Sequence, residues 1–390
     1  MRFSSLVDRL DAPGGAAWDI HQAARQAEAR GEDVILLSVG DPDFATPAPI
    51  VERAVAALRA GDTHYTAIPG RPALRAALAD LQRRRTGVPT EPDNVMMVAG
   101  AQNGLFTTAL SLFEAGDEVL VIEPSYATYE ATFAASGAGL VRVPAAAADG
   151  FRPAVEALAA AVTPRTRAIL LANPNNPTGV VMTDRELAVV AEVATRRDLW
   201  VVADEVYEGL VFDRQHRSIR TLPGMAERSV TIGSLSKSHA MTGWRIGWVV
   251  GPAELIRHMD RLALNMLYGL PGFIQEAAVA ALDQYDDTTR SMRDSYRGRV
   301  DLVSDGLADT PGLTVLRPEA GMFALLDVRG TGLGSKEFAW GLFRRTGVSL
   351  VDAAAFGPAT AGFVRLALAA SEERLGEACR RIAGHARMLA

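Results

Sequence analysis

Lysine is scarce in this chain, and this scarcity narrows the search for amine chemistry. The sequence of 390 residues holds 40 lysine and arginine residues, and reading it through finds only two lysines, Lys237 and Lys336. A lysine amine can condense with an aldehyde to form a Schiff base. Apart from the α-amino group, such chemistry in this protein depends on one of these two side chains.

Lys237 belongs to a set of polar residues that follow short apolar runs. Asn176, Asp204 and the pair Ser234 and Lys237 each come just after a segment that reads as a buried strand. Ligands of parallel sheets bind beyond the carboxyl ends of the strands, so an amide, a carboxylate and an amine are expected at one edge. Taken singly, each residue has a structural explanation as a turn, a helix cap or a surface charge. Their joint occurrence favours a functional site.

The chemistry of this set suits pyridoxal 5′-phosphate. A pyridine ring that acts as an electron sink needs a carboxylate at its nitrogen, and a phosphate needs N–H groups at a helix start, hydroxyls and a guanidinium. Gly100-Ala101-Gln102 supplies a loop and a helix start, Arg245 supplies a guanidinium, and Tyr126 supplies a ring that could stack on the cofactor.

The elements that must position these residues alternate along the chain. Continuous apolar strands that alternate with helices predict an α/β fold with a large, doubly wound, mostly parallel sheet and a smaller α+β domain. We expect an N-terminal segment at 1–45 that packs with the small domain, a large domain at 46–290 and a small domain at 291–390. Strands are expected at 94–99, 117–122, 140–143, 168–172, 199–203, 229–233, 246–250, 322–327 and 363–367. Helices are expected at 105–114, 125–136, 153–162, 184–196, 291–307 and 372–389.

Composition excludes several classes of protein. Hydrophobic residues make up 48% of the chain, which is too much for a disordered protein, and the net charge of −6 argues against nucleic acid as the main partner. The single cysteine, Cys379, cannot form an internal disulfide. The sequence has no apolar run of membrane-spanning length, and its N-terminus lacks the apolar core of a signal peptide, so a cytoplasmic protein is expected.

The segment from Ser234 to Gly247, SLSKSHAMTGWRIG, resembles the lysine signature of the class I/II aminotransferases, the fold-type I enzymes that use pyridoxal 5′-phosphate. Further segments match this family in order, and together they cover nearly the whole chain. They are GDPDFATP at 40–47, YTAIPG at 65–70, NPTG at 176–179, DEVY at 204–207 and FVRL at 363–366.

The resemblance implies the catalytic roles. Lys237 would hold the cofactor as a Schiff base and then act as general base and acid in a proton shift. Asp204 would pair with the ring nitrogen, while Tyr207 and Asn176 would contact the ring 3-oxygen. The reaction would be a ping-pong transamination through pyridoxamine phosphate, with an amino acid and a 2-oxo acid as small-molecule partners.

The resemblance also implies the binding roles, and no metal site is expected. The phosphate would be bound by Ala101, Gln102, Ser234, Ser236 and Arg245. Arg365 would grip the substrate α-carboxylate as a bidentate pair, with Gly40 close by. Tyr65 would reach the phosphate of the neighbouring subunit, which implies a homodimer with two shared sites.

Several stretches resemble arginine–pyruvate aminotransferases more closely than the general family, among them AWDIH at 17–21. A substrate with a guanidinium group would bind to a carboxylate or to the face of an aromatic ring. The candidates for this contact, in no order of preference, are Trp18, Asp19, Tyr268 and Glu208. No arginine occurs between residues 263 and 275, which disfavours a dicarboxylate specialist. Aspartate, aromatic or alanine aminotransferase activity stays an alternative.

Two other readings remain open at this point. A lyase or an oxidase could use the same scaffold, because the carbanion that the cofactor stabilises can react in several ways. A remote alternative is a regulatory domain that binds the aldehyde, although residues 1–35 are too short for a winged helix.

Overall fold

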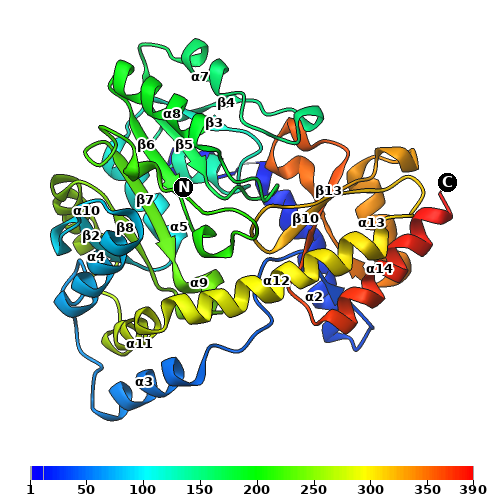
Figure 1. Cartoon of the computed structure of the whole chain (residues 1–390), viewed down its shortest axis with the longest axis horizontal. Helices are drawn as coiled ribbons and strands as arrows, with labels where there is room; N and C mark the ends of the chain where they lie inside the picture. The colour runs from blue at the N-terminus through cyan, green and yellow to red at the C-terminus, as the bar shows by residue number, and fades with distance from the viewer. Residues whose placement is uncertain (1, 12, 390) are drawn as a thin grey trace.

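A seven-stranded sheet with helices on both faces forms the larger part of the protein (Figure 1). The computed structural model describes residues 2–11 and 13–389. The strand order is β2-β8-β7-β6-β5-β3-β4, and only β8 runs antiparallel to its two neighbours. The strands are β2 (Val95–Val98), β3 (Glu118–Ile122), β4 (Gly139–Val143), β5 (Thr166–Ala172), β6 (Trp200–Asp204), β7 (Ser229–Ser234) and β8 (Gly247–Val250). This architecture confirms the predicted doubly wound, mostly parallel sheet.

Both faces of the sheet are buried because its strands are apolar throughout. Leu170 and Val202 face a core that includes Leu105 of α5, whereas Ile169 and Val201 face the opposite core. A strand alternates its side chains between faces, so a continuous apolar run suits a sheet that is covered on both sides. The helices in this part are α3 (Ala48–Arg59), α4 (Pro72–Thr86), α5 (Ala101–Leu112), α6 (Tyr129–Ala134), α7 (Val155–Ala161), α8 (Asp184–Arg197), α9 (Leu235–Ser238), α10 (Ala253–Met266) and α11 (Gly272–Asp283).

A smaller antiparallel sheet of order β12-β13-β10-β9 lies to the right in Figure 1. The long helix α12 (Tyr285–Leu307) runs between the two parts, from beside α11 towards α14. The remaining elements are α1 (Ser5–Arg9), α2 (Asp19–Ala29), β1 (Ile35–Leu36), β9 (Thr314–Leu316), β10 (Phe323–Asp327), α13 (Ser335–Thr346), β11 (Val348–Ser349), β12 (Val351–Asp352), β13 (Phe363–Ala367) and α14 (Glu372–Arg387). β1 pairs in parallel with β11, which ties the N-terminal segment to this part of the protein.

Several expected helices differ in their bounds from those observed. The helix expected at 105–114 spans Ala101–Leu112, and the one expected at 153–162 spans Val155–Ala161. The helix expected at 125–136 spans only Tyr129–Ala134. The segment before it is tied to the smaller part of the protein, since the backbone N–H of Ser125 donates to the carbonyl of Phe356. The helix expected from residue 291 starts at Tyr285, within the predicted large domain, and continues into the smaller one. The predicted domain limits themselves stay a prediction.

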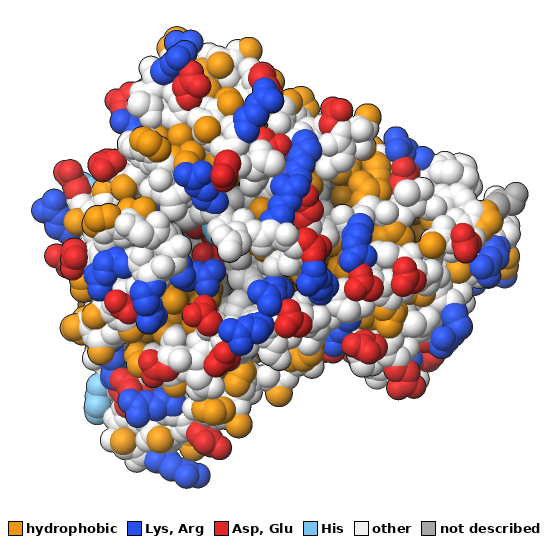
Figure 2. Space-filling model, viewed as in Figure 1, with side chains coloured by type: hydrophobic (Ala, Val, Ile, Leu, Met, Phe, Trp, Pro, Cys, Tyr) orange, Lys and Arg blue, Asp and Glu red, His pale blue; other side chains and the backbone are white. Residues whose placement is uncertain are grey.

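The surface mixes charges. On the face shown in Figure 2, basic and acidic side chains are interspersed among apolar ones. Among residues 2–11 and 13–389, no helix combines the length and the apolar character that crossing a membrane requires.

Candidate active site

A cavity of about 220 Å³ lies at the carboxyl ends of β5, β6 and β7. Neighbouring strands are in register here, with Ala172 opposite Asp204 and Asp204 opposite Ile232, so the residues that follow them meet. Of the predicted catalytic, cofactor and α-carboxylate residues, all except Tyr65 line this cavity, and so does Trp18. These residues are Trp18, Gly40, Ala101, Gln102, Tyr126, Asn176, Asp204, Tyr207, Ser234, Ser236, Lys237, Arg245 and Arg365.

Lys237 is presented by the short helix α9, which begins directly after β7. The hydroxyl of Ser234 caps this helix by accepting the backbone N–H of Ser236 at 3.0 Å. The amine of Lys237 donates to the carbonyl of Gly40 at 2.7 Å. Burial lowers the pKa of Lys237 from 10.5 to about 8, with Arg365 acting in the same direction and Asp204 against it. About a tenth of the amine is therefore neutral and nucleophilic at pH 7, far more than for an ordinary lysine.

Asp204 is a buried carboxylate that a tyrosine holds in place. The phenol of Tyr129 donates to Oδ2 of Asp204 at 2.7 Å, and the backbone N–H of Val206 donates to Oδ1 at 3.3 Å. Burial raises the pKa of Asp204, while the Tyr129 hydrogen bond and the charge of Lys237 lower it. A buried carboxylate of this kind is suited to a cationic partner in the cavity.

The start of α5 forms a cradle with Arg245. Gly100 precedes the helix at φ 82°, and a Cβ atom there would lie 2.5 Å from Nη2 of Arg245. The guanidinium donates to the carbonyls of Thr242 at 2.8 Å and Ala99 at 3.1 Å, which fixes it beside the helix start. Free N–H groups at a helix N-terminus and a fixed guanidinium together suit a phosphate.

Two of the predicted phosphate ligands already make other contacts. The side-chain amide of Gln102 donates to Thr132 at 2.7 Å and accepts from Thr128 at 2.9 Å, so its backbone N–H is the group that can face a phosphate. The hydroxyl of Ser234 lies 2.8 Å from that of Ser236 and 2.9 Å from the carbonyl of Ile246.

Arg365 is buried in β13, between two aromatic rings. Its guanidinium lies 5.1 Å from the ring centroid of Phe323 and 4.8 Å from that of Phe356. It donates to Oδ1 of Asn176 at 3.0 Å and to the carbonyl of Ser38 at 3.2 Å. Its Nε is buried without a partner in the described part of the chain. A guanidinium has five N–H donors, so most of them remain for a ligand.

Aromatic side chains make up further walls of the cavity. The ring of Tyr207 packs edge-on against Phe323 at 5.1 Å, and Tyr126 packs edge-on against Tyr129 at 5.8 Å. Trp18 lines the cavity just before α2. These rings give the cavity the apolar surface that a planar ligand needs.

Tyr65 is the one predicted cofactor residue that does not line the cavity. It is 87% exposed, and its ring lies 5.2 Å from that of Tyr268. Its own subunit therefore cannot use it in this cavity, which is compatible with the expected role in a partner's site. That role stays a prediction.

Of the other candidates for a guanidinium contact, Asp19, Glu208 and Tyr268 do not line the cavity either. Glu208 accepts a hydrogen bond from Tyr285 at 2.9 Å and lies in a cluster with Glu205 and His216 whose possible ligand atoms are within 4.8 Å of one another. Burial and the charge of Glu208 raise the pKa of Glu205 to about 8.

Sequence reasoning missed the roles of Tyr129 and Ser38. Tyr129 stands three residues after Tyr126, a spacing that would have suggested a shared face, but its partner Asp204 is 75 residues away in sequence. Ser38 contributes only its carbonyl, which no sequence pattern reveals.

The cavity fits pyridoxal 5′-phosphate by the chemistry of its groups. It joins an amine with a lowered pKa, a buried carboxylate, a glycine-opened helix start next to a fixed guanidinium, and a second guanidinium with free donors. The fold and this constellation define an aminotransferase of fold type I.

Comparison with known proteins agrees with this definition. The family model for aminotransferase class I and II matches residues 32–382, and the chain belongs to this family. The arginine–pyruvate transaminase of Pseudomonas aeruginosa is 51% identical over 383 residues, which are 98% of each chain. An aspartate aminotransferase of Musicola paradisiaca is 34% identical, covering 95% of this chain and 94% of the relative.

Solved structures show the same fold. Aspartate aminotransferase from Thermus thermophilus, solved with maleate, superimposes with a TM-score of 0.92 at 33% identity, over 99% of this chain and 100% of that one. The aromatic aminotransferase of Pyrococcus horikoshii gives a TM-score of 0.88 at 35% identity, over 94% of this chain and 100% of that one. This protein is therefore an aminotransferase, and the family implies dependence on pyridoxal 5′-phosphate.

Proposed function

We propose that this enzyme transfers the amino group of L-arginine to pyruvate, with pyridoxal 5′-phosphate bound at Lys237, as a homodimer with shared active sites. The observation that carries the proposal is the 51% identity to an arginine–pyruvate transaminase over nearly the full length. The constellation around Lys237 supplies the groups that the chemistry needs.

Binding of the cofactor is assigned to groups at the strand ends and the helix start. Arg245, the hydroxyl of Ser234 and the backbone N–H groups of Ala101 and Gln102 would hold the phosphate. Tyr126 would stack on the ring. Ser236 would support Ser234, whose hydroxyl lies 2.8 Å away.

Proton movement is assigned to Lys237 and Asp204. When bound, the cofactor supplies an electron sink for the charge left on the substrate α-carbon. The amine of Lys237 would remove the α-proton and return it at the cofactor carbon, because its lowered pKa suits both directions near neutral pH. Asp204 would keep a proton on the ring nitrogen by pairing with it.

Orientation of the substrate is assigned to Arg365 and Asn176. Arg365 would bind the α-carboxylate with its free donors, near Gly40. Since Oδ1 of Asn176 accepts from Arg365, its Nδ2 is left to donate to the ring oxygen, together with the phenol of Tyr207.

The cationic side chain of the substrate arginine is assigned to aromatic residues, Trp18 of the same subunit and Tyr268 of a partner subunit. Trp18 is the candidate that lines the cavity, and the face of its indole attracts a cation. Tyr268 lies next to Tyr65 and would reach the substrate only from a partner subunit.

The test is a screen of half-reactions. Cofactor-loaded enzyme receives single amino acids without an oxo acid, and loss of the visible band of the bound cofactor is followed. L-Arginine should convert it fastest, and pyruvate should restore it. A faster reaction with aspartate, alanine or an aromatic amino acid would refute the arginine assignment, whereas ammonia release without an oxo acid would indicate a lyase or an oxidase.

The two lysines offer a matched control. Lys237→Ala should abolish both the visible band and turnover. Lys336→Ala, which changes an exposed side chain in α13, should leave both unchanged. A band that survives in Lys237→Ala, with cofactor that borohydride reduction fixes to the protein, would show that another amine holds the cofactor.

A further inference from the structure

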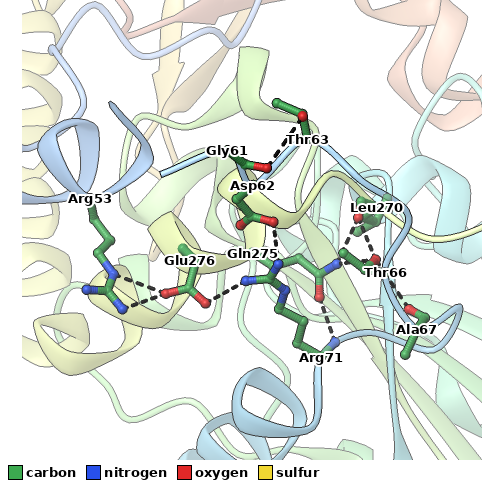
Figure 3. A network of polar contacts seen from close by, with 10 residues as sticks. All are labelled: Arg53, Gly61, Asp62, Thr63, Thr66, Ala67, Arg71, Leu270, Gln275 and Glu276. Atoms are coloured by element: carbon green, nitrogen blue, oxygen red, sulfur yellow. Dashed lines mark hydrogen bonds and ion pairs between the residues drawn. The ribbon is translucent and has the colours of Figure 1, made fainter. Parts of the chain in front are cut away.

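Tyr65 and Tyr268 stand on two separate loops that one buried side chain connects. This side chain belongs to Gln275 in the first turn of α11, and Gln275 is 0% exposed. Tyr65 belongs to the loop between α3 and α4, and Tyr268 to the loop between α10 and α11. Figure 3 shows Gln275 between the two loops.

Gln275 uses both ends of its amide. Oε1 accepts the backbone N–H of Arg71 at 2.7 Å, while Nε2 donates to the hydroxyl of Thr66 and to the carbonyl of Leu270, both at 2.9 Å. Thr66 closes the link by donating from its own hydroxyl to the same Leu270 carbonyl at 2.8 Å. We call this group, Thr66, Leu270 and Gln275, the amide clamp.

The two loops that the clamp joins are also in direct contact with each other. A Cβ atom on Gly269 would lie 2.6 Å from Oγ1 of Thr66 and 2.7 Å from its carbonyl oxygen. A buried amide that has found three partners is costly to rearrange, because each broken contact would leave a buried polar group without a partner.

A chain of charges anchors the other end of the Tyr65 loop. Arg71 donates to Asp62 at 2.5 Å and to Glu276 at 2.8 Å, and Arg53 of α3 contacts the second oxygen of Glu276 at 2.5 Å (Figure 3). The segment from Asp62 to Arg71 is therefore held at its first residue, at Thr66 and at its last residue. Tyr65 lies directly beside the middle anchor.

We propose that Gln275 is a positioning residue that acts across the subunit interface: through Thr66 it fixes Tyr65 for the phosphate site of the partner subunit. This inference rests on the proposed function, in which Tyr65 serves the neighbouring site. The amide clamp sets the position of a side chain that its own subunit does not use.

The test measures how tightly the loaded dimer holds its cofactor. Three single variants are compared: Tyr65→Phe removes the proposed phosphate contact, Gln275→Leu removes the clamp, and Thr66→Val removes only the hydroxyl at its centre. Tyr65→Phe should raise the cofactor dissociation constant roughly tenfold to 150-fold, the effect of one hydrogen bond to a charged group. Gln275→Leu and Thr66→Val should raise it by a part of that factor, because they displace Tyr65 without removing its hydroxyl. Thr63→Val, which changes an exposed threonine of the same loop outside the clamp, should have no effect.

Double variants separate positioning from a general structural effect. If Gln275 and Thr66 act through Tyr65, neither Gln275→Leu nor Thr66→Val should weaken cofactor binding further once Tyr65→Phe is present. Sedimentation confirms that each variant is still a dimer. Additive losses would overturn the proposal, and if Gln275→Leu fails to fold, the Thr66→Val pair decides it.

The results also distinguish this proposal from the proposed function. If Tyr65→Phe weakens cofactor binding while Thr66→Val and Gln275→Leu do not, the clamp proposal alone is wrong. If Tyr65→Phe has no effect, the shared site of the proposed function fails and the clamp proposal falls with it.

Discussion

Replacing Arg365 with lysine should weaken substrate binding while leaving the cofactor in place. Lysine keeps the positive charge but loses the planar fork that can bind a carboxylate with two parallel hydrogen bonds. It also leaves Oδ1 of Asn176 and the carbonyl of Ser38 without the donors that now serve them at 3.0 and 3.2 Å.

The magnitude follows from the lost contact. A hydrogen bond to a charged group contributes about 1.5–3 kcal/mol, and Arg365→Lys removes one of two such bonds to the α-carboxylate. At about 1.4 kcal/mol for each factor of ten, kcat/KM should fall roughly tenfold to 140-fold. The loss of contacts to Asn176 and Ser38 affects the folded enzyme before substrate binds, so it should lower the melting temperature as well.

The assay is the single-turnover half-reaction at varied amino acid concentration. The visible band of the bound cofactor should be unchanged, and the fall in kcat/KM should include a higher half-saturating concentration. Arg329→Lys is the matched control: this exposed arginine also pairs with a polar group, Asp327, and also lies over an aromatic ring, Phe363, at 4.9 Å. A loss in Arg365→Lys no larger than that in the control would refute the assignment of Arg365 to the α-carboxylate.

Three further predictions concern Tyr129, Asp204 and Lys237. Tyr129→Phe should cost about 1–3 kcal/mol of unfolding free energy. The Tyr129 hydrogen bond lowers the pKa of Asp204, so its removal should raise that pKa and move the acid limb of the kcat/KM profile to higher pH. An acid limb at unchanged pH would contradict this. Asp204→Asn should reduce kcat at least a hundredfold, because the charge opposite the ring nitrogen is lost; the exposed Asp198→Asn is the control, and equal kcat values would exclude the role. In the apoenzyme, cofactor capture needs the neutral amine of Lys237, so with a pKa of about 8 the capture rate should rise roughly fivefold from pH 7 to 8 and level off by pH 9, whereas a rise that continues to pH 10 would indicate an ordinary lysine.

The placement of Lys237, Asp204 and Asn176 was predictable because it depends on order along the chain. Apolar strands alternating with helices predict a parallel sheet, and the carboxyl ends of neighbouring strands must then meet. Lys237 and Asn176 follow strands β7 and β5, and Asp204 is the last residue of β6, which lies between these two strands in the sheet. A helix start after Gly100 was predictable in the same way, although α5 begins at Ala101 and not at the expected residue 105.

The sequence by itself determined the class of fold, the enzyme family and the groups that can do the chemistry, because these follow from local patterns. Tertiary structure alone decided how those groups are tuned. Tyr129 reaches Asp204, Ser38 offers its carbonyl to Arg365, and burial lowers the pKa of Lys237. It also placed Tyr65 outside its own cavity and brought the buried Gln275 into contact with Thr66. These features depend on contacts between distant segments and on exclusion of water, which arise only when the chain packs.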